Sequence, residues 1–367
     1  MKLNRINAFL MVSALLAGAG CRQEVPADAL RTRLQQAAES GKFYYVHQDD
    51  LSYGHSWKVE DPATDGISRS DVKAVCGSEP GGVGFDLGGI ELGAKANLDG
   101  VDFDFMRRAA VSFSERGGFV TFSWHARNPL TGGDSWDVSQ SGVVASVLEG
   151  GQNHDKFMNW LEKAADFIAS LKDHSGHRIP VIFRPWHENI GSWFWWGGNL
   201  CTADQYKALF ALTYDYFVNV RCLDNILWAY SPNSEIDAEQ YFSRYPGDEY
   251  VDILGVDHYE SLNGTLEEAD AHYMAVLERD LGYMQEFASV HKKLIAVTET
   301  GFEGIPNPAW WTDVLLKAVE GHPICYVLTW RNAWDKPGHF YAPFPGSADA
   351  QNFMGFYENG RTLFLNK

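Results

Sequence analysis

Eight short and almost wholly apolar runs recur along the chain, and their regular recurrence restricts the fold more than any other feature of the sequence. They occupy residues 43–46, 83–87, 119–124, 181–184, 226–230, 251–256, 294–297 and 325–329. Each run has the length of a β-strand and lacks the polar alternation of a strand with one face in water. This composition is typical of parallel strands that are covered on both faces.

Amphipathic stretches separate these runs. Between residues 155 and 171, for example, Trp160, Ala164 and Ile168 recur at a spacing of four, which places them on one helical face. Similar patterns cover residues 27–40, 103–116, 203–220 and 266–290. Strands that alternate with helices in this way predict an α/β fold, a single (β/α)₈ TIM barrel. A doubly wound open sheet is the alternative, but no glycine-rich dinucleotide-binding turn supports it.

The composition is that of an acidic globular protein. The chain has 367 residues, a formal net charge of −18 and 45% hydrophobic residues, which excludes a disordered chain. The acidic excess argues against nucleic acid or an anionic membrane surface as a partner, because both would repel it. Aromatic residues make up 14% of the chain and 13 of them are Trp, which indicates surfaces on which flat ligands stack.

The first twenty residues have the pattern of an export signal. Lys2 and Arg5 precede a short apolar run over residues 6–20, which is too short for a comfortable membrane span. Cys21 follows directly after small residues and resembles a bacterial lipoprotein cleavage site, so it is a candidate lipidation site; ordinary signal-peptide cleavage is the alternative. We therefore divide the chain into a signal peptide (1–20), an N-terminal segment (22–41) and the barrel (42–367).

Four further cysteines follow Cys21, and their pairing stays open. Four thiols allow three disulfide pairings, and buried free thiols are an equal alternative. No CxxC spacing points to zinc or redox chemistry. The four are Cys76, Cys201, Cys222 and Cys325.

Polar and aromatic residues replace aliphatic ones at the ends of several runs, where a (β/α)₈ barrel carries its active site. Glu188 follows the fourth run and Glu299 follows the seventh. A pair of carboxylates across a barrel mouth is suited to glycoside hydrolysis, in which one protonates the departing oxygen and the other attacks the sugar. The alternative is a pair of salt-bridge partners at the barrel rim. Four tryptophans near strand ends are interpreted as cleft residues rather than core: Trp124, Trp193, Trp330 and Trp334.

The fourth run leads into Arg-Pro-Trp-His-Glu-Asn-Ile-Gly-Ser-Trp-Phe-Trp-Trp-Gly, residues 184–197, which resembles the signature of glycoside hydrolase family 26, the β-mannanases. Glu299-Thr300-Gly301 is similar to the strand-seven motif of that family, and the resemblance extends from about Lys42 onward. It implies that Glu188 is the acid/base and that Glu299 is the nucleophile. Around them it implies roles in binding and positioning the substrate for His125, Arg184, His187, Trp193, Asp257, Tyr259 and Trp330.

The resemblance implies a retaining β-1,4-mannan hydrolase that acts on mannan, glucomannan or galactomannan without a cofactor or a metal. We expect a monomer, exported to the periplasm or outer membrane of a Gram-negative bacterium. Endo and exo action stay open, since the loops over residues 88–100 and 128–151 are both long enough to close one end of a cleft. The alternatives are a β-1,3-xylanase or β-1,3-1,4-glucanase of the same family, and a non-catalytic glycan-binding lipoprotein.

Overall fold

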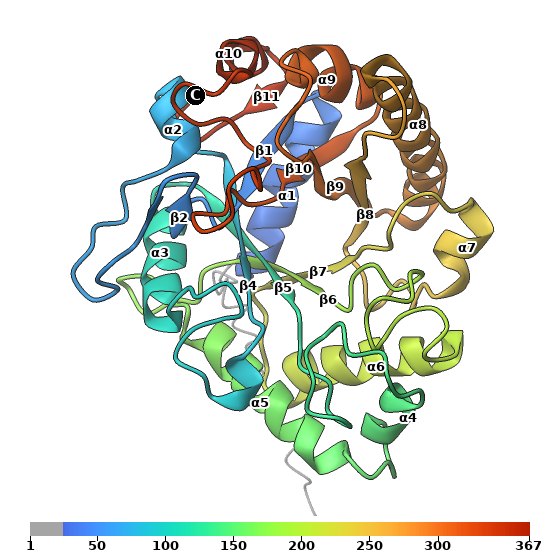
Figure 1. The fold of residues 1–367 in the computed structure, drawn as a ribbon. Helices are drawn as coiled ribbons and strands as arrows, with labels where there is room; N and C mark the ends of the chain where they lie inside the picture. The colour runs from blue at the N-terminus through green and yellow to red at the C-terminus, as the bar shows by residue number, and fades with distance from the viewer. Residues whose placement is uncertain (1–24) are drawn as a thin grey trace, which may run out of the picture.

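The computed structural model describes residues 25–367 and places eight parallel strands in a closed barrel (Figure 1). The predicted signal peptide and Cys21 lie outside the described residues. The predicted (β/α)₈ barrel is confirmed, and each predicted run forms one barrel strand. The strands are β1 (Phe43–Gln48), β4 (Gly82–Asp86), β5 (Phe119–Trp124), β6 (Val181–Pro185), β7 (Ile226–Tyr230), β8 (Ile253–Glu260), β9 (Leu294–Phe302) and β10 (Ile324–Thr329).

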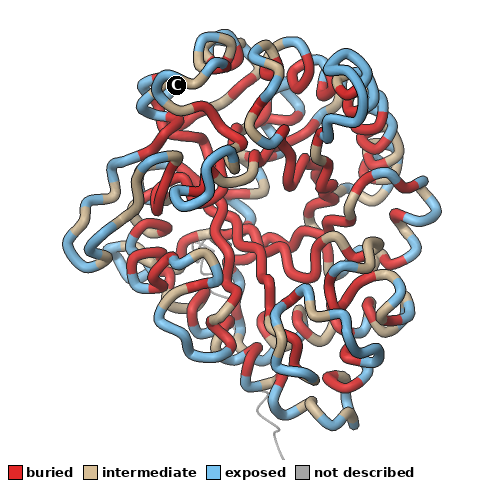
Figure 2. The backbone as a smooth tube through the Cα atoms, viewed as in Figure 1, coloured by how far each residue is buried: buried red, intermediate tan, exposed pale blue. Residues whose placement is uncertain are grey.

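Closure of the barrel leaves no free edge among these eight strands. Each strand pairs with the next in chain order, and β1 pairs with both β4 and β10, with Tyr45 opposite Val327. The strands are buried along nearly their whole length, as the red ring of backbone in Figure 2 shows. This burial explains the apolar composition of the runs. Three short strands lie outside the barrel: β2 (Tyr53–Gly54) and β3 (Trp57–Lys58) form a hairpin, and β11 (Thr362–Leu363) adds to the start of β1.

Helices cover the outside of the barrel, and the predicted helical patterns are confirmed to within a few residues. Their starts follow local capping chemistry: Thr202 and Thr265 each form a capping box with the residue three positions later. The helices are α1 (Pro26–Glu39), α2 (Asp71–Cys76), α3 (Phe103–Glu115), α4 (Val143–Val147), α5 (His154–Ser170), α6 (Ala203–Asp215), α7 (Ala238–Ser243), α8 (Leu266–His291), α9 (Leu316–Ala318) and α10 (Ala350–Glu358), with a 3₁₀ turn at Ile90–Leu92 and π-helical turns at Tyr216–Val220 and Trp311–Leu315. None of the helices within residues 25–367 has the length and apolar character of a membrane span.

Helix α1 covers the end of the barrel where the strands begin. Its buried residues Leu30 and Leu34 belong to one apolar cluster with Val46, Ile182 and other residues that fill the barrel interior. Arg31 pairs with Asp252 at 2.6 Å and also donates to the backbone oxygen of Lys292. Helix α1 therefore closes one end of the barrel and leaves the other end open for a site.

Two strands extend beyond their predicted runs at the open end. The seventh predicted run stops at Val297, but β9 continues to Phe302, and β8 continues through Asp257 and Tyr259. A register irregularity between Val256 and Asp257 marks the start of this extension. The polar residues that were predicted to follow these strands therefore lie within them, where backbone pairing fixes their direction.

The four cysteines beyond Cys21 are unpaired. Of the pairing alternatives that the sequence left open, the structure shows free thiols. Three of these free thiols, those of Cys76, Cys201 and Cys325, are buried, and that of Cys222 is exposed.

Candidate active site

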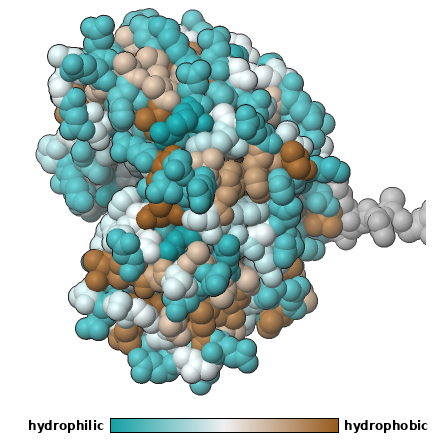
Figure 3. Space-filling model, turned by 90° about the vertical axis from the view of Figure 1, so that its right-hand side faces the viewer, coloured by the Kyte–Doolittle hydropathy of each residue, from teal (hydrophilic) through white to brown (hydrophobic). Residues whose placement is uncertain are grey.

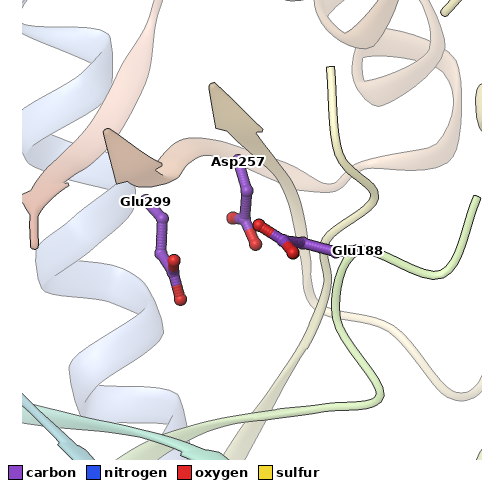
Figure 4. Close-up of side chains that lie close together, drawn as sticks. All are labelled: Glu188, Asp257 and Glu299. Carbon is purple, nitrogen blue, oxygen red and sulfur yellow. The ribbon is translucent and has the colours of Figure 1, made fainter. Parts of the chain in front are cut away.

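Glu188 and Glu299 project into the same space at the open end of the barrel (Figure 4). Glu188 lies three residues after the end of β6, and Glu299 lies within β9. Together with Asp257 of β8, each offers one carboxylate oxygen within 4.8 Å of the others. In profile the molecule is hollowed on the side that faces the viewer in Figure 1 (Figure 3). The two predicted carboxylates are thus near neighbours in a cleft.

The backbone that carries Glu188 is strained. Trp186 and Glu188 both have left-handed φ angles, 56° and 52°. Such conformations cost about 1–3 kcal/mol each and persist only where the surroundings enforce them. Here Trp186 is fully buried against Trp124, Trp195 and Trp196, with ring centroids 5.3–5.4 Å apart. The tryptophans beneath Glu188 therefore hold the turn that directs its side chain into the cleft.

Glu299 is held by donors on both of its oxygens. Arg184 of β6 donates to Oε1 and the Tyr259 hydroxyl donates to Oε2 at 2.7 Å. Arg184 also donates to Asp257 at 2.7 Å, so one buried guanidinium links two carboxylates. Charge-assisted bonds of this kind stabilise the ionised carboxylate. Both oxygens of Glu299 are thereby held in a fixed orientation.

Glu188 has the opposite electrostatic environment. Burial, and then the nearby Glu299 carboxylate, raise the pKa of Glu188 to about 7. The indole Nε1 of Trp193 donates to Oε2 of Glu188 at 2.5 Å, which favours the charged form to a smaller extent. A pKa near neutrality suits Glu188 to donate a proton, which is one of the two roles that a pair of catalytic carboxyl groups must divide.

Two histidines lie beside the carboxylates, and an aspartate that the sequence prediction omitted holds one of them. Nε2 of His187 is 3.2 Å from Nε2 of His125, whose Nδ1 is 2.7 Å from Asp86 Oδ2. Asp86 is the last residue of β4. It falls inside the run predicted over residues 83–87, so a search of the residues that follow each run passes over it.

Aromatic rings line the cleft, but not all of those predicted. Trp193 is 41% exposed and Trp330 is half-buried, and both border the cleft with Tyr341. Trp334 is also exposed, although it borders a neighbouring pocket and stacks on Lys58 at 4.0 Å. The interpretation of Trp124 as a cleft residue is wrong: it is fully buried and its Nε1 donates to Glu91. The ring points outward from the barrel strand into the layer of helices and loops.

Trp136 lines the cleft and was not predicted. It is 47% exposed, comes from the loop over residues 128–151, and stacks on His125 with ring centroids 5.1 Å apart. Nothing in the local sequence separates it from other loop residues. Its contact with His125 arises only when the loop folds back over the end of β5.

The three clustered carboxylates raise the question of a cation. Their spacing is within the range of metal-binding groups, since one oxygen from each of Glu188, Asp257 and Glu299 lies within 4.8 Å of the others. Arg184, however, already pairs with both Asp257 and Glu299 and supplies positive charge at this position. The oxygens that would ligate an ion are therefore engaged by the protein itself.

A (β/α)₈ barrel with paired carboxylates after β6 and in β9 defines the class of barrel glycoside hydrolases. The chain belongs to glycosyl hydrolase family 26, whose model matches residues 44–293. The predicted family is confirmed.

Individual relatives agree with this assignment. The structure is similar to that of a GH26 β-mannanase from Bacteroides ovatus, BoMan26A, with a TM-score of 0.87 and 46% identity over 93% of this chain and 95% of that one. It is also similar to the catalytic domain of a Bacillus sp. JAMB-750 GH26 endo-β-1,4-mannanase, with a TM-score of 0.84 and 31% identity over 93% and 92% of the two chains. A mannan endo-1,4-β-mannosidase from Bifidobacterium adolescentis is 31% identical over 337 residues, which are 87% of this chain but 33% of that protein.

The chain thus spans about a third of the Bifidobacterium protein. It spans 44% of a second relative, a mannan endo-1,4-β-mannosidase from Thermothelomyces thermophilus that is 30% identical over 245 residues, 64% of this chain.

Proposed function

We propose that the protein is a retaining β-1,4-mannan hydrolase. The observation that carries the proposal is the carboxylate pair: oxygens of Glu188 and Glu299 lie within 4.8 Å, the pKa of Glu188 is raised to about 7, and Arg184 and Tyr259 orient Glu299. Retaining glycosidases hold their carboxyl groups about 5–5.5 Å apart, whereas inverting ones leave about 6.5–9.5 Å for a water. Mannan as the substrate rests on the family and on the names of its relatives.

The reaction then runs in two displacements. Glu299, oriented by Arg184 and Tyr259, attacks the anomeric carbon while Glu188 protonates the departing oxygen. The Glu188 carboxylate next takes a proton from water, which attacks the glycosyl-enzyme and releases the sugar. Trp330, at the end of β10, is proposed as the platform under the reacting sugar, and Trp193 as the floor on the leaving-group side.

The experiment that tests the function is hydrolysis of a panel of polysaccharides. Linear mannan, glucomannan and galactomannan should be degraded, whereas β-1,3-xylan and mixed-linkage β-1,3-1,4-glucan should not. Proton NMR of the first products on mannotetraose should show the β anomer before mutarotation. First release of the α anomer, or preference for xylan or glucan, would reject the proposal. Products over time on linear mannan resolve mode of action, since steady mannobiose means exo attack and a ladder means endo attack.

Location and assembly are proposed as well. We infer that the enzyme is exported, that Cys21 carries a lipid anchor, and that the protein acts as a monomer. The lipoprotein-like leader supports the first two inferences. Incorporation of a labelled fatty acid should be lost in Cys21→Ala, and light scattering of the variant should give the mass of one chain.

A further inference from the structure

Asp86 is fully buried and surrounded by donors from three directions. Its oxygens accept from the backbone N–H of Gly88 at 2.6 Å, from the Ser123 hydroxyl at 2.6 Å, and from Nδ1 of His125 at 2.7 Å. The backbone N–H of His125 points at the same carboxylate. A buried carboxylate with this many donors is ionised, and its position is fixed.

The contact with Asp86 fixes the position of one proton on His125, and the contact with His187 concerns a second. Because Asp86 accepts from Nδ1 of His125, that nitrogen carries a proton. The contact between the two Nε2 atoms, at 3.2 Å, needs one further proton. Burial, and then the charges of Arg184 and His125, hold the pKa of His187 well below its usual range, so His187 is neutral and carries a single proton, on Nδ1 or on Nε2. With that proton on Nδ1, His187 accepts from His125, which then carries a proton on each nitrogen and is a cation; with it on Nε2, His187 donates and His125 is neutral.

The groups that face His125 favour the arrangement in which it is the cation. Burial acts to lower the pKa of His125, but the Asp86 carboxylate outweighs it, with smaller help from Glu299 and Asp99, and the pKa is raised. The charged or titratable groups around the ring come from β4 and its loop, from β6 and from β9: Asp86, Asp99, Arg184, His187, Glu188 and Glu299. The face of the ring is covered by Trp136, which stabilises a cation further.

We propose that Asp86 is a positioning residue for the reaction: it fixes the His125 ring as a cation that donates through Nε2 to His187, beside the acid/base Glu188. This inference rests on the role proposed for Glu188. His125 in turn lowers the pKa of Glu188, against the larger opposite effect of burial. Asp86 thereby acts through two imidazole rings on the pH range in which the leaving group is protonated.

The variant Asp86→Asn tests the inference, because it keeps the size of the side chain and removes its charge. Loss of the His125 cation should raise the pKa of Glu188, so the basic limb of kcat/KM on mannotetraose should move to higher pH. The kcat/KM on mannotetraose should fall about tenfold or more. This is part of the rate enhancement of roughly 10²–10⁴-fold that general acid–base catalysis supplies. The fall should be much smaller on 2,4-dinitrophenyl β-mannobioside, whose leaving group needs no proton.

Ser123→Ala is the matched control, since it removes another hydrogen bond to Asp86 but leaves the carboxylate in place. Its basic limb should stay at the wild-type pH. The inference would be overturned if the basic limb of Asp86→Asn stayed at the wild-type pH. It would also be overturned if the basic limb of Ser123→Ala moved as far as that of Asp86→Asn. Imidazole NMR of the wild-type enzyme gives a measurement that needs no variant: His125 should be protonated on both nitrogens at neutral pH, and a neutral ring would also overturn it.

Glu188→Ala separates this inference from the function beneath it. That variant should lose the basic limb altogether. If it retains the limb, the proposed role of Glu188 fails. If it loses the limb while Asp86→Asn behaves as wild type, only the role of Asp86 fails.

Discussion

The two ends of the barrel are built from the same strands and differ in nearly every physical respect. Where the strands begin, aliphatic side chains such as Ile182 and Leu227 share one buried apolar cluster with Leu34 of α1. Where the strands end, Arg184, Asp257 and Glu299 are buried together. The first arrangement is one that hydrophobic burial stabilises, and the second costs desolvation that only mutual pairing offsets.

The difference teaches which end each substitution should affect. Polar groups at the open end are oriented for chemistry, and Trp186 and Glu188 remain in left-handed conformations there. Strain and buried charge of this kind are tolerated because the closed end and the outer helices supply stability. Changes at the open end should therefore alter activity more than stability, and changes at the closed end should do the reverse.

The largest effect is expected from Glu299→Ala. Without the nucleophile no glycosyl-enzyme forms, so kcat should fall by at least about 10⁵-fold on every substrate, whatever its leaving group. Thermal unfolding should remain cooperative. With azide, any product from a β-glycoside should have the α configuration, because attack comes from the opposite face. A burst of dinitrophenolate from this variant would show that the two glutamate roles are reversed.

The next effect is expected from Glu188→Ala, and it should depend on the leaving group. On mannan the loss should be about 10²–10⁴-fold, because an alkoxide departs poorly without a proton. On 2,4-dinitrophenyl β-mannobioside, stopped-flow measurement should show a rapid burst followed by a slow steady rate, since no base activates water. Azide should accelerate that steady rate and give the β-azide. Equal losses on both substrates would contradict the assignment of Glu188 as the acid.

At the closed end, Leu34→Ala should reduce stability and spare catalysis. Leu34 is fully buried in the apolar cluster, and truncation of such a side chain costs about 2–5 kcal/mol of unfolding free energy. The denaturation midpoint should fall while kcat/KM of the folded enzyme stays at the wild-type value. Exposed Gln35 lies on the same helix, and Gln35→Ala provides the control with little change in either quantity. A loss of kcat in Leu34→Ala would show that the two ends are coupled.

The smallest effect is expected from Trp330→Ala. The half-buried ring borders the cleft, so its removal should lower kcat/KM about 10- to 100-fold through poorer orientation of the reacting sugar. The unfolding midpoint should change little. Kinetics on mannotetraose with parallel denaturation measure both, and an unfolded or fully active variant would refute the platform role.

Much of this organisation could be predicted from the sequence because it depends on local pattern. The apolar runs and helical spacings identify the barrel, and the polar endings identify Glu188 and Glu299. Asp86 could not be found in that way, because it lies inside its predicted run, and its role depends on contact with His125, which follows the neighbouring strand β5. Trp124 shows the converse, since its position at a strand end does not reveal which face of the strand it occupies.

The placement of α1 has a practical consequence for handling the enzyme. Val25 and Pro26 border one shallow depression with Lys172, Arg178 and Asp224, which lie in the turns before β6 and β7, on the face away from the cleft. A tag or linker joined directly ahead of residue 25 therefore starts on the face of the molecule opposite the cleft. When the protein is captured on beads through such a tag, its cleft should face the solution. A polymeric substrate should therefore reach the cleft of the immobilised enzyme as readily as that of the free enzyme.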